Sequence, residues 1–207
     1  MDPIEGEELQ QSGSSYSGSP RVGLSTKFGN LNVQASPNEG TPDWVVVYKR
    51  PWPKVPFLRI HSSCLFSEAF ASTDCDCALQ LHAALKVVAE EGGAVVYLYQ
   101  EGRGQGIFRK IQAIAVEQEH EVDTAEAFNR LGYHLDPRDY SKVGEALRAI
   151  GFPSNIRLAT SNPRKVAALG EVGYTVEDRV QLKIALTAKI KKYLRSKVLG
   201  LNHYESD

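Results

Sequence analysis

The chain has few cysteines and no excess of charge of either sign. Its 207 residues include three cysteines, and 24 Lys and Arg residues are balanced by 25 Asp and Glu residues. A formal net charge of −1 provides no positive field for long nucleic acid, so we expect no such partner. Recognition of a small anion would depend on locally placed Arg and Lys side chains.

Long hydrophobic runs are also missing. No apolar run approaches the roughly 20 residues that span a bilayer, and the acidic start, residues 1–8, is unlike a secretory signal. We therefore expect a cytoplasmic protein with no membrane partner.

Three cysteines cannot all pair within one chain, and Cys75 and Cys77 are too close for an ordinary disulfide. Thiol or metal-ligand roles in a reducing compartment fit better.

Size and composition predict one domain preceded by a tail. A hydrophobic content of 42% in 207 residues suffices for one core. Residues 1–20 are rich in Ser, Gly and Glu and lack periodic apolar positions, which predicts a disordered tail. Residues 21–207 are then expected to form the folded domain.

Hydrophobic periodicity divides this domain into alternating strands and helices. Clusters of β-branched and aromatic residues predict strands at 44–48, 57–61, 94–99, 155–160 and 174–180. Apolar residues at helical spacing predict helices at 76–91, 107–119, 141–150, from 163 onward and at 186–199, the last with a basic face typical of solvent exposure. This alternation predicts a single-domain layered α/β fold with a mixed sheet.

All three cysteines fall within one short stretch, with Cys64 at a strand end and Cys75 and Cys77 at the start of a helix. Three thiolates can hold one zinc ion and leave a fourth tetrahedral position for water, whose pKa zinc lowers toward neutrality. Two other interpretations stay open from the residues alone. The cysteines could simply pack in the core, or a structural zinc could take a fourth ligand such as His61 or His82.

A glycine-rich turn, residues 100–106, follows the predicted strand 94–99 and precedes a helix. At such a turn, backbone N–H groups can face an anion. Without the cysteine motif, Glu101 and Arg103 in this turn would be interpreted as a solvated ion pair, and Lys165 could be a surface lysine.

Four motifs occur in order along the chain: Leu58-Arg59-Ile60-His61-Ser62-Ser63-Cys64, Cys75-Asp76-Cys77-Ala78-Leu79-Gln80-Leu81, Gln100-Glu101-Gly102-Arg103-Gly104 and Thr160-Ser161-Asn162-Pro163-Arg164-Lys165. Together they closely resemble GTP cyclohydrolase II, from about residue 58 to the C-terminus. That family opens the imidazole ring of GTP at C8, releases formate and pyrophosphate, and begins riboflavin synthesis. The resemblance implies the family's fold and catalytic activity for residues 21–207, and a homodimer.

The resemblance also implies roles for individual residues. It implies one Zn²⁺ per chain held by Cys64, Cys75 and Cys77, and Mg²⁺ accompanying the triphosphate of GTP. It implies that Asp136 is the proton acceptor and Arg138 the residue that attacks the α-phosphate. The implied GTP contacts are Arg59, Gln80, Glu101, Arg103, Thr124, Thr160 and Lys165. Without the resemblance, Asp136 and Arg138 would be interpreted as residues of a plain turn.

The sequence departs from the family pattern near these residues. Ile114 stands where the family carries a catalytic tyrosine, so a hydroxyl that could donate a proton is missing. Tyr99 and Asp74 each replace an arginine, which predicts a less positive pocket. Two further replacements are Ser63 for Glu and Ser67-Glu68 for a Gly-Asp pair.

These departures leave three hypotheses. In the first, the chain opens the guanine ring of GTP fully and releases formate. In the second, the ring opens but the product keeps its formyl group and feeds a specialised pathway, with GTP or another guanine nucleotide as substrate. In the third, the chain keeps the zinc and nucleotide sites but has lost catalysis.

Overall fold

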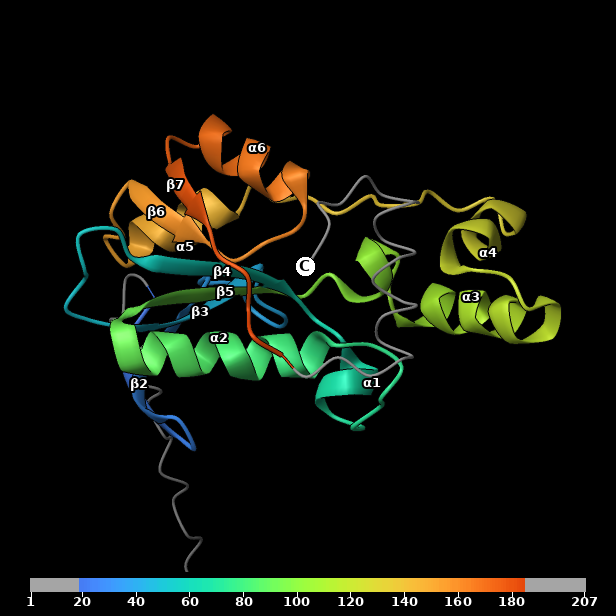
Figure 1. Cartoon of the computed structure of the whole chain (residues 1–207), viewed down its shortest axis with the longest axis horizontal. Helices are drawn as coiled ribbons and strands as arrows, with labels where there is room; N and C mark the ends of the chain where they lie inside the picture. The colour runs from blue at the N-terminus through green and yellow to red at the C-terminus, as the bar shows by residue number, and fades with distance from the viewer. Residues whose placement is uncertain (1–18, 185–207) are drawn as a thin grey trace, which may run out of the picture.

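Residues 19–184, which the computed structural model describes, form a seven-stranded sheet covered by helices on both faces (Figure 1). The strands are β1 (Val22–Thr26), β2 (Gly29–Ala35), β3 (Trp44–Lys49), β4 (Phe57–Ser62), β5 (Gly93–Leu98), β6 (Asn155–Leu158) and β7 (Thr175–Arg179). The predicted helix at 186–199 and the predicted tail at 1–20, apart from Ser19 and Pro20, lie outside the described residues.

The helices lie on the two faces of the sheet and beyond one of its ends. They are α1 (Leu65–Glu68), α2 (Cys77–Glu91), α3 (Ile107–His120), α4 (Thr124–Arg130), α5 (Val143–Ala149) and α6 (Pro163–Glu171), with a 3₁₀ turn, η1, at Glu101–Gly104. In Figure 1, α2 lies along one face, α5 and α6 cover the other, and α3 with α4 project as a separate lobe. No helix within residues 19–184 is long and apolar enough to cross a membrane.

The sheet is mixed, as predicted, in the order β1-β2-β3-β5-β4-β6-β7. The strands β1, β2, β3 and β5 pair antiparallel, whereas β5, β4, β6 and β7 pair parallel. Parallel strands end at the same edge of a sheet, and ligands of α/β proteins bind outside these carboxyl ends. The segments that follow β4, β5 and β6 therefore meet at one edge, and they carry Cys64, the glycine turn and Thr160.

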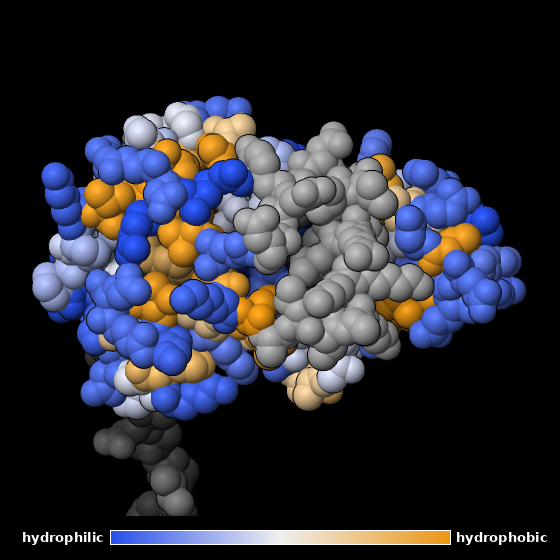
Figure 2. All heavy atoms as spheres, in the orientation of Figure 1, coloured by the Kyte–Doolittle hydropathy of each residue, from blue (hydrophilic) through white to orange (hydrophobic). Residues whose placement is uncertain are grey.

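Apolar residues fill three clusters. The largest lies between the sheet and α5 and α6 and includes Tyr48, Ile60, Val96 and Leu147. A second lies between the sheet and α2, around Phe57. The lobe has its own small core, whose buried residues are Ala113, Ala127 and Phe128. On the described part of the face in Figure 2, hydrophobic patches are separated by hydrophilic side chains.

Two glycines place β5 beside β4. Gly92 ends α2 and Gly93 begins β5. Their φ values are +80° and +137°, which residues other than glycine rarely adopt. A Cβ atom on Gly93 would come within 2.3 Å of the carbonyl oxygen of Phe57. Glycine is required here because the backbones of the two strands approach too closely for a side chain.

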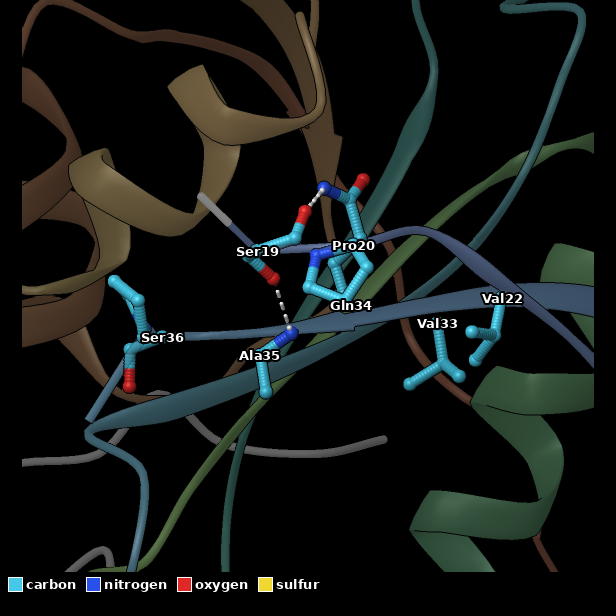
Figure 3. A pocket seen from close by; sticks show the side chains of 8 residues that line it. Ser19, Pro20, Val22, Val33, Gln34, Ala35 and Ser36 are labelled. Atoms are coloured by element: carbon cyan, nitrogen blue, oxygen red, sulfur yellow. Dashed lines mark hydrogen bonds between the residues drawn. The ribbon is translucent and has the colours of Figure 1, made fainter. Parts of the chain in front are cut away.

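Four elements, β1, β2, α1 and α4, were absent from the sequence predictions. The hairpin of β1 and β2 has mostly exposed or half-buried residues, so its apolar pattern is weak. Residues of the hairpin line a groove of about 250 Å³, where the Ser19 carbonyl accepts a hydrogen bond from Gln34 Nε2 and the Ser19 hydroxyl accepts one from Ala35 N (Figure 3). Helix α4 has seven residues, too few for a clear helical period. No residue lining the groove belongs to the predicted site.

Candidate functional site

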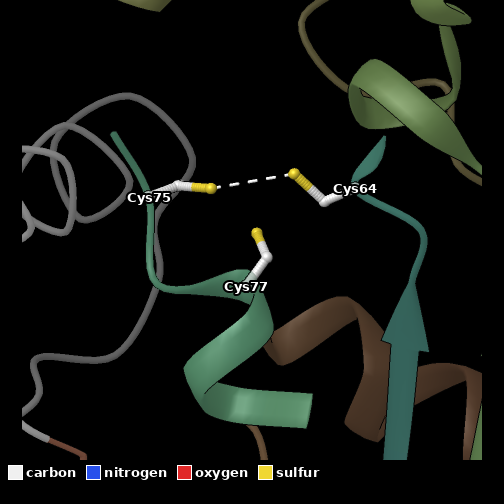
Figure 4. Close-up of side chains that lie close together, drawn as sticks. All are labelled: Cys64, Cys75 and Cys77. Carbon is white, nitrogen blue, oxygen red and sulfur yellow. Dashed lines mark hydrogen bonds between the residues drawn. The ribbon is translucent and has the colours of Figure 1, made fainter. Parts of the chain in front are cut away.

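The three cysteines converge at the edge where β4 ends and α2 begins. Cys64 is the N-cap residue of α1, and Cys77 is the first residue of α2. Their thiols point toward a common centre in Figure 4. All three Sγ atoms lie within 4.8 Å of one another, and the Sγ atoms of Cys64 and Cys75 are 3.7 Å apart. The structure thus brings the three predicted ligands together.

This cluster fits a tetrahedral zinc ion. With Zn–S bonds of about 2.3 Å, two sulfur ligands of a tetrahedral ion are about 3.8 Å apart, close to the 3.7 Å found between Cys64 and Cys75. Among the described residues, no His, Asp or Glu joins the group. His61 instead bonds Glu68 at 2.9 Å, and the ring of His82 lies 5.7 Å from that of Phe28. Neither histidine is placed as the fourth ligand of a structural zinc.

The surroundings of Cys75 favour the ionised form of its thiol. The pKa of Cys75 is lowered well below its ordinary value, chiefly by hydrogen bonds with the Cys64 and Cys77 thiols and further by one with Ser67. The ammonium of Lys110 lies 3.4 Å from Cys64 Sγ. Since thiolates are the form that binds metal, this environment suits a metal centre better than simple packing of cysteines.

A buried network fixes the backbone of Cys64. The carboxylate of Glu68 accepts hydrogen bonds from Cys64 N at 3.0 Å and Tyr97 OH at 2.7 Å, and it contacts His61 Nε2 at 2.9 Å. Burial lowers the pKa of His61 and raises that of Tyr97, so both are neutral donors to the carboxylate. The sequence marked Glu68 only as a departure from the family, because nothing in its spacing connects it with residue 97.

The glycine turn holds Glu101 against the start of α1. Gly102 and Arg103 adopt left-handed conformations with φ values of +57° and +59°. The Glu101 carboxylate accepts hydrogen bonds from Leu65 N at 2.6 Å, Gly102 N at 2.9 Å and Lys110 Nζ at 2.8 Å. The guanidinium of Arg103 lies over the ring of Phe128, 5.5 Å from its centre. Glu101 is therefore paired with Lys110, and the interpretation as a solvated Glu101–Arg103 pair is wrong.

Asp136 and Arg138 form a bidentate ion pair beside this turn. Arg138 Nε and Nη2 donate to the two carboxylate oxygens of Asp136 at 2.7 and 2.8 Å, and Arg164 adds a contact at 3.0 Å. Burial alone would raise the pKa of Asp136, but the bonds and charges of Arg138 and Arg164 lower it. Asp136 is thus ionised, and it can accept a proton only if these arginines release it. A Cβ on Gly104 would lie 3.3 Å from Arg138.

Arg59, Gln80 and Lys165 belong to β4, α2 and α6. Arg59 donates to the Ala159 carbonyl at 2.8 Å and to the Gln80 side chain, which itself donates to Asp76. Burial lowers the pKa of Arg59. Lys165 is only 5% exposed and donates to the Ile60 carbonyl at 2.8 Å. The interpretation of Lys165 as a surface lysine is therefore wrong.

The two predicted threonines lie in different places. Thr160 follows β6 at the sheet edge, and its hydroxyl accepts a hydrogen bond from Asn162 N at 3.0 Å. Thr124 begins α4 in the lobe and hydrogen-bonds Glu117 on α3, whose pKa is raised by burial. The position of Thr124 thus depends on α3 and α4, whereas that of Thr160 depends on the end of β6.

Comparisons with known proteins identify relatives that align with most of the chain. GTP cyclohydrolase-2 of Helicobacter acinonychis is 37% identical over 183 residues, covering 87% of this chain and 93% of that protein. GTP cyclohydrolase-2 of Pseudomonas fluorescens is 46% identical over 146 residues, 70% of each chain. The riboflavin biosynthesis protein RibBA of Bacillus velezensis is 41% identical over 187 residues, 88% of this chain but only 46% of that longer protein.

A solved structure is more distant. RibBX, a two-domain 3,4-dihydroxy-2-butanone 4-phosphate synthase from A. baumannii, has a TM-score of 0.41 and 15% identity over 83% of this chain and 42% of its own. The model of the family described as GTP cyclohydrolase II matches residues 19–181, which include all the site residues predicted above. The chain belongs to the GTP cyclohydrolase II family.

Proposed function

We propose that this protein is a zinc-dependent hydrolase that opens the imidazole ring of GTP at C8 and releases pyrophosphate. The observation that carries the proposal is the convergence of three thiols beside the glycine turn in a chain of this family. Riboflavin biosynthesis, the process for which the Bacillus velezensis relative is named, is the pathway we propose first.

The cysteines would hold the metal. Cys64, Cys75 and Cys77 supply three thiolate ligands, a set that suits zinc. When bound with an open fourth position, zinc supplies Lewis-acid activation of water, which is the chemistry that attack on C8 requires. The carboxylate of Glu68 keeps Cys64 in place through its backbone N–H.

The remaining side chains would bind and orient the nucleotide. Glu101, fixed by three donors, presents a carboxylate that can accept hydrogen bonds from the guanine base. Arg138 offers its guanidinium to phosphate oxygens, and Asp136 holds that guanidinium in place. Proton transfer at Asp136 would follow once phosphate draws both Arg138 and Arg164 away. We propose that the other GTP contacts are Arg59, Gln80, Arg103, Thr124, Thr160 and Lys165.

Magnesium would arrive with the substrate. Among residues 19–184, the cysteine trio is the sole group of three or more His, Cys, Asp or Glu side chains placed to hold a metal. Mg²⁺ commonly binds through substrate phosphates and only one or two carboxylates. We also propose, from the family, a homodimer in the cytoplasm.

Ile114 favours a second candidate reaction. It lies on α3 one turn after Lys110, on the same side of the helix, and it is half-buried. An isoleucine offers no hydroxyl for hydrolysis of the formamide that ring opening leaves. In this alternative the product keeps its formyl group and feeds a specialised pathway, with GTP or another guanine nucleotide as substrate.

Product analysis tests both reactions. The zinc-loaded protein is incubated with GTP and Mg²⁺, and the products are identified by mass spectrometry together with assays for formate and pyrophosphate. Ring-opened product with formate supports the complete reaction, and ring-opened product with a retained formyl group supports the alternative. If GTP and other guanine nucleotides stay intact while zinc is bound, the protein is a non-catalytic binding homologue and the proposal is wrong.

An Ile114→Tyr variant tests the role of that position. If the missing hydroxyl limits formate release, the variant releases more formate per ring opened than the wild type. An Ile114→Phe variant is the matched control, because it adds the ring without the hydroxyl. Equal formate ratios in the wild type and both variants would contradict the importance of Ile114.

A further inference from the structure

Lys110 lies between the cysteine cluster and the glycine turn. Its ammonium is 3.4 Å from Cys64 Sγ and 2.8 Å from the Glu101 carboxylate, and its side chain is 18% exposed. It also lies over the ring of Phe66, 4.6 Å from the centre. Lys110 belongs to the stretch around Ile114, and no motif of the sequence predicted a role for it.

The Lys110 side chain packs against two other elements, the glycine turn and α1. A Cβ atom on Gly102 would lie 2.9 Å from Cβ of Lys110, so the glycine allows the turn to pack directly on the lysine stem. Phe66, on α1, contacts the ammonium from a third element. The side chain is thereby held by α1 and by the turn, while its backbone belongs to α3.

The Lys110 ammonium affects both the Cys64 sulfur and the Glu101 carboxylate. A hydrogen bond to a thiolate stabilises the sulfur lone pairs, so the sulfur gives less electron density to a metal and leaves it a stronger Lewis acid. The same ammonium neutralises and orients Glu101, whose oxygens would otherwise repel nearby thiolates. One side chain therefore adjusts the metal ligand and fixes the carboxylate proposed to face the base.

We infer that Lys110 is a positioning residue that couples the Cys64 thiolate to the Glu101 carboxylate and so sets the metal centre and the nucleotide turn in one geometry. This inference rests on the proposed function, since it requires a metal at the cysteines and a nucleotide at the turn. It adds to that function a residue of the lobe that contacts both the cysteine cluster and the glycine turn.

Cobalt substitution tests the inference. Co²⁺ is added to metal-free wild type and to Lys110→Met, which keeps an unbranched stem but has no donor. The thiolate-to-cobalt absorption band is expected at longer wavelength in the variant, because the sulfur lone pairs lose a stabilising hydrogen bond. With zinc, kcat/KM for GTP is expected to fall about 10- to 100-fold, as for other outer-shell partners of metal ligands. Lys110→Arg, which keeps an N–H donor, should restore the band position.

Lys86→Met is the matched control, because Lys86 is an exposed lysine on α2 with a salt bridge to Glu90 at 3.8 Å. It should behave as wild type. A cobalt band and a kcat/KM of Lys110→Met that match those of Lys86→Met would overturn the inference. If Lys110→Met does not fold by circular dichroism, Lys110→Leu, which also has no donor, takes its place with the same expectations. A wild type that takes up no Co²⁺ would instead contradict the metal centre itself, and the inference with it.

Discussion

The sheet and the lobe of α3 and α4 contribute to the same site but have cores of very different size. The sheet carries the cysteines, Arg59 and Lys165 above two extensive apolar clusters. The lobe carries Lys110, Ile114 and Thr124, and its core has three buried residues. The difference teaches that the proposed metal ligands are attached to the part of the described chain that has the larger apolar core. Ile114, which is proposed to decide the product, belongs to the lobe, where the smaller core should let a substitution affect the rest of the fold less.

The largest effect is expected on the sheet side, at the metal ligands. Replacing Cys77 by Ser removes one of three thiolates, so zinc affinity should fall by more than the roughly 10- to 100-fold that loss of an outer-shell partner costs. Competition with a chelator measures this affinity. Ser63→Ala, beside Cys64, is the control and should bind zinc as wild type does. Unchanged affinity in Cys77→Ser would mean that Cys77 is not a ligand.

Two alanine substitutions compare the cores directly. Phe57, fully buried in the sheet, and Phe128, 2% exposed in the lobe, should each lose about 3–5 kcal/mol of local stability on replacement by Ala. Phe57→Ala should lower the free energy of global unfolding. Phe128→Ala should mainly increase hydrogen exchange in α3 and α4 while zinc affinity is retained. We expect the two cores to be independent. This would be contradicted if Phe128→Ala lost zinc binding while the amides of the sheet kept their protection from hydrogen exchange.

The smallest expected effect concerns the ion pair of Asp136. Its pKa in the folded protein is lowered below the ordinary value, so its ionised form stabilises the fold above the unfolded-state pKa of about 3.9. That stabilisation is lost as the pH falls through the folded-state pKa. Asp136→Asn should therefore cost about 1–3 kcal/mol at pH 7 and progressively less below pH 4. Denaturant unfolding of both proteins at several pH values measures the difference, which should not stay constant down to pH 3.

Most of the fold could be predicted from the sequence, because each long element carries its own signal. The Gly92-Gly93 stop after α2 and the β-branched run of β5 are local, and the structure places both elements within a residue or two of the prediction. The hairpin of β1 and β2 was missed because one of its faces is not clearly apolar. Strand order could not be predicted, since it depends on contacts between distant segments.

The residues of the site that belong to sequence motifs could be predicted. The motifs around Cys64, Cys75 and Cys77 resemble those of the family and thereby predicted a metal centre, and the structure brings the three thiols together. The partners that surround them were not predictable: Glu68 meets Tyr97 across 29 positions, and Lys110 meets Cys64 across 46. Only the folded chain relates these residues, because a hydrogen bond between two elements leaves no period or spacing in the sequence.

The short distance along the chain between Cys64 and Cys77 has a consequence for the order of folding. Closing a loop of this length costs little entropy, so the thiol cluster needs only the end of β4 and the first turn of α2. The bond from Lys165 to Ile60 joins residues 105 positions apart and requires β6 and α6. During synthesis from the N-terminus, the cysteine cluster can therefore assemble before the segment that completes the nucleotide edge has been made.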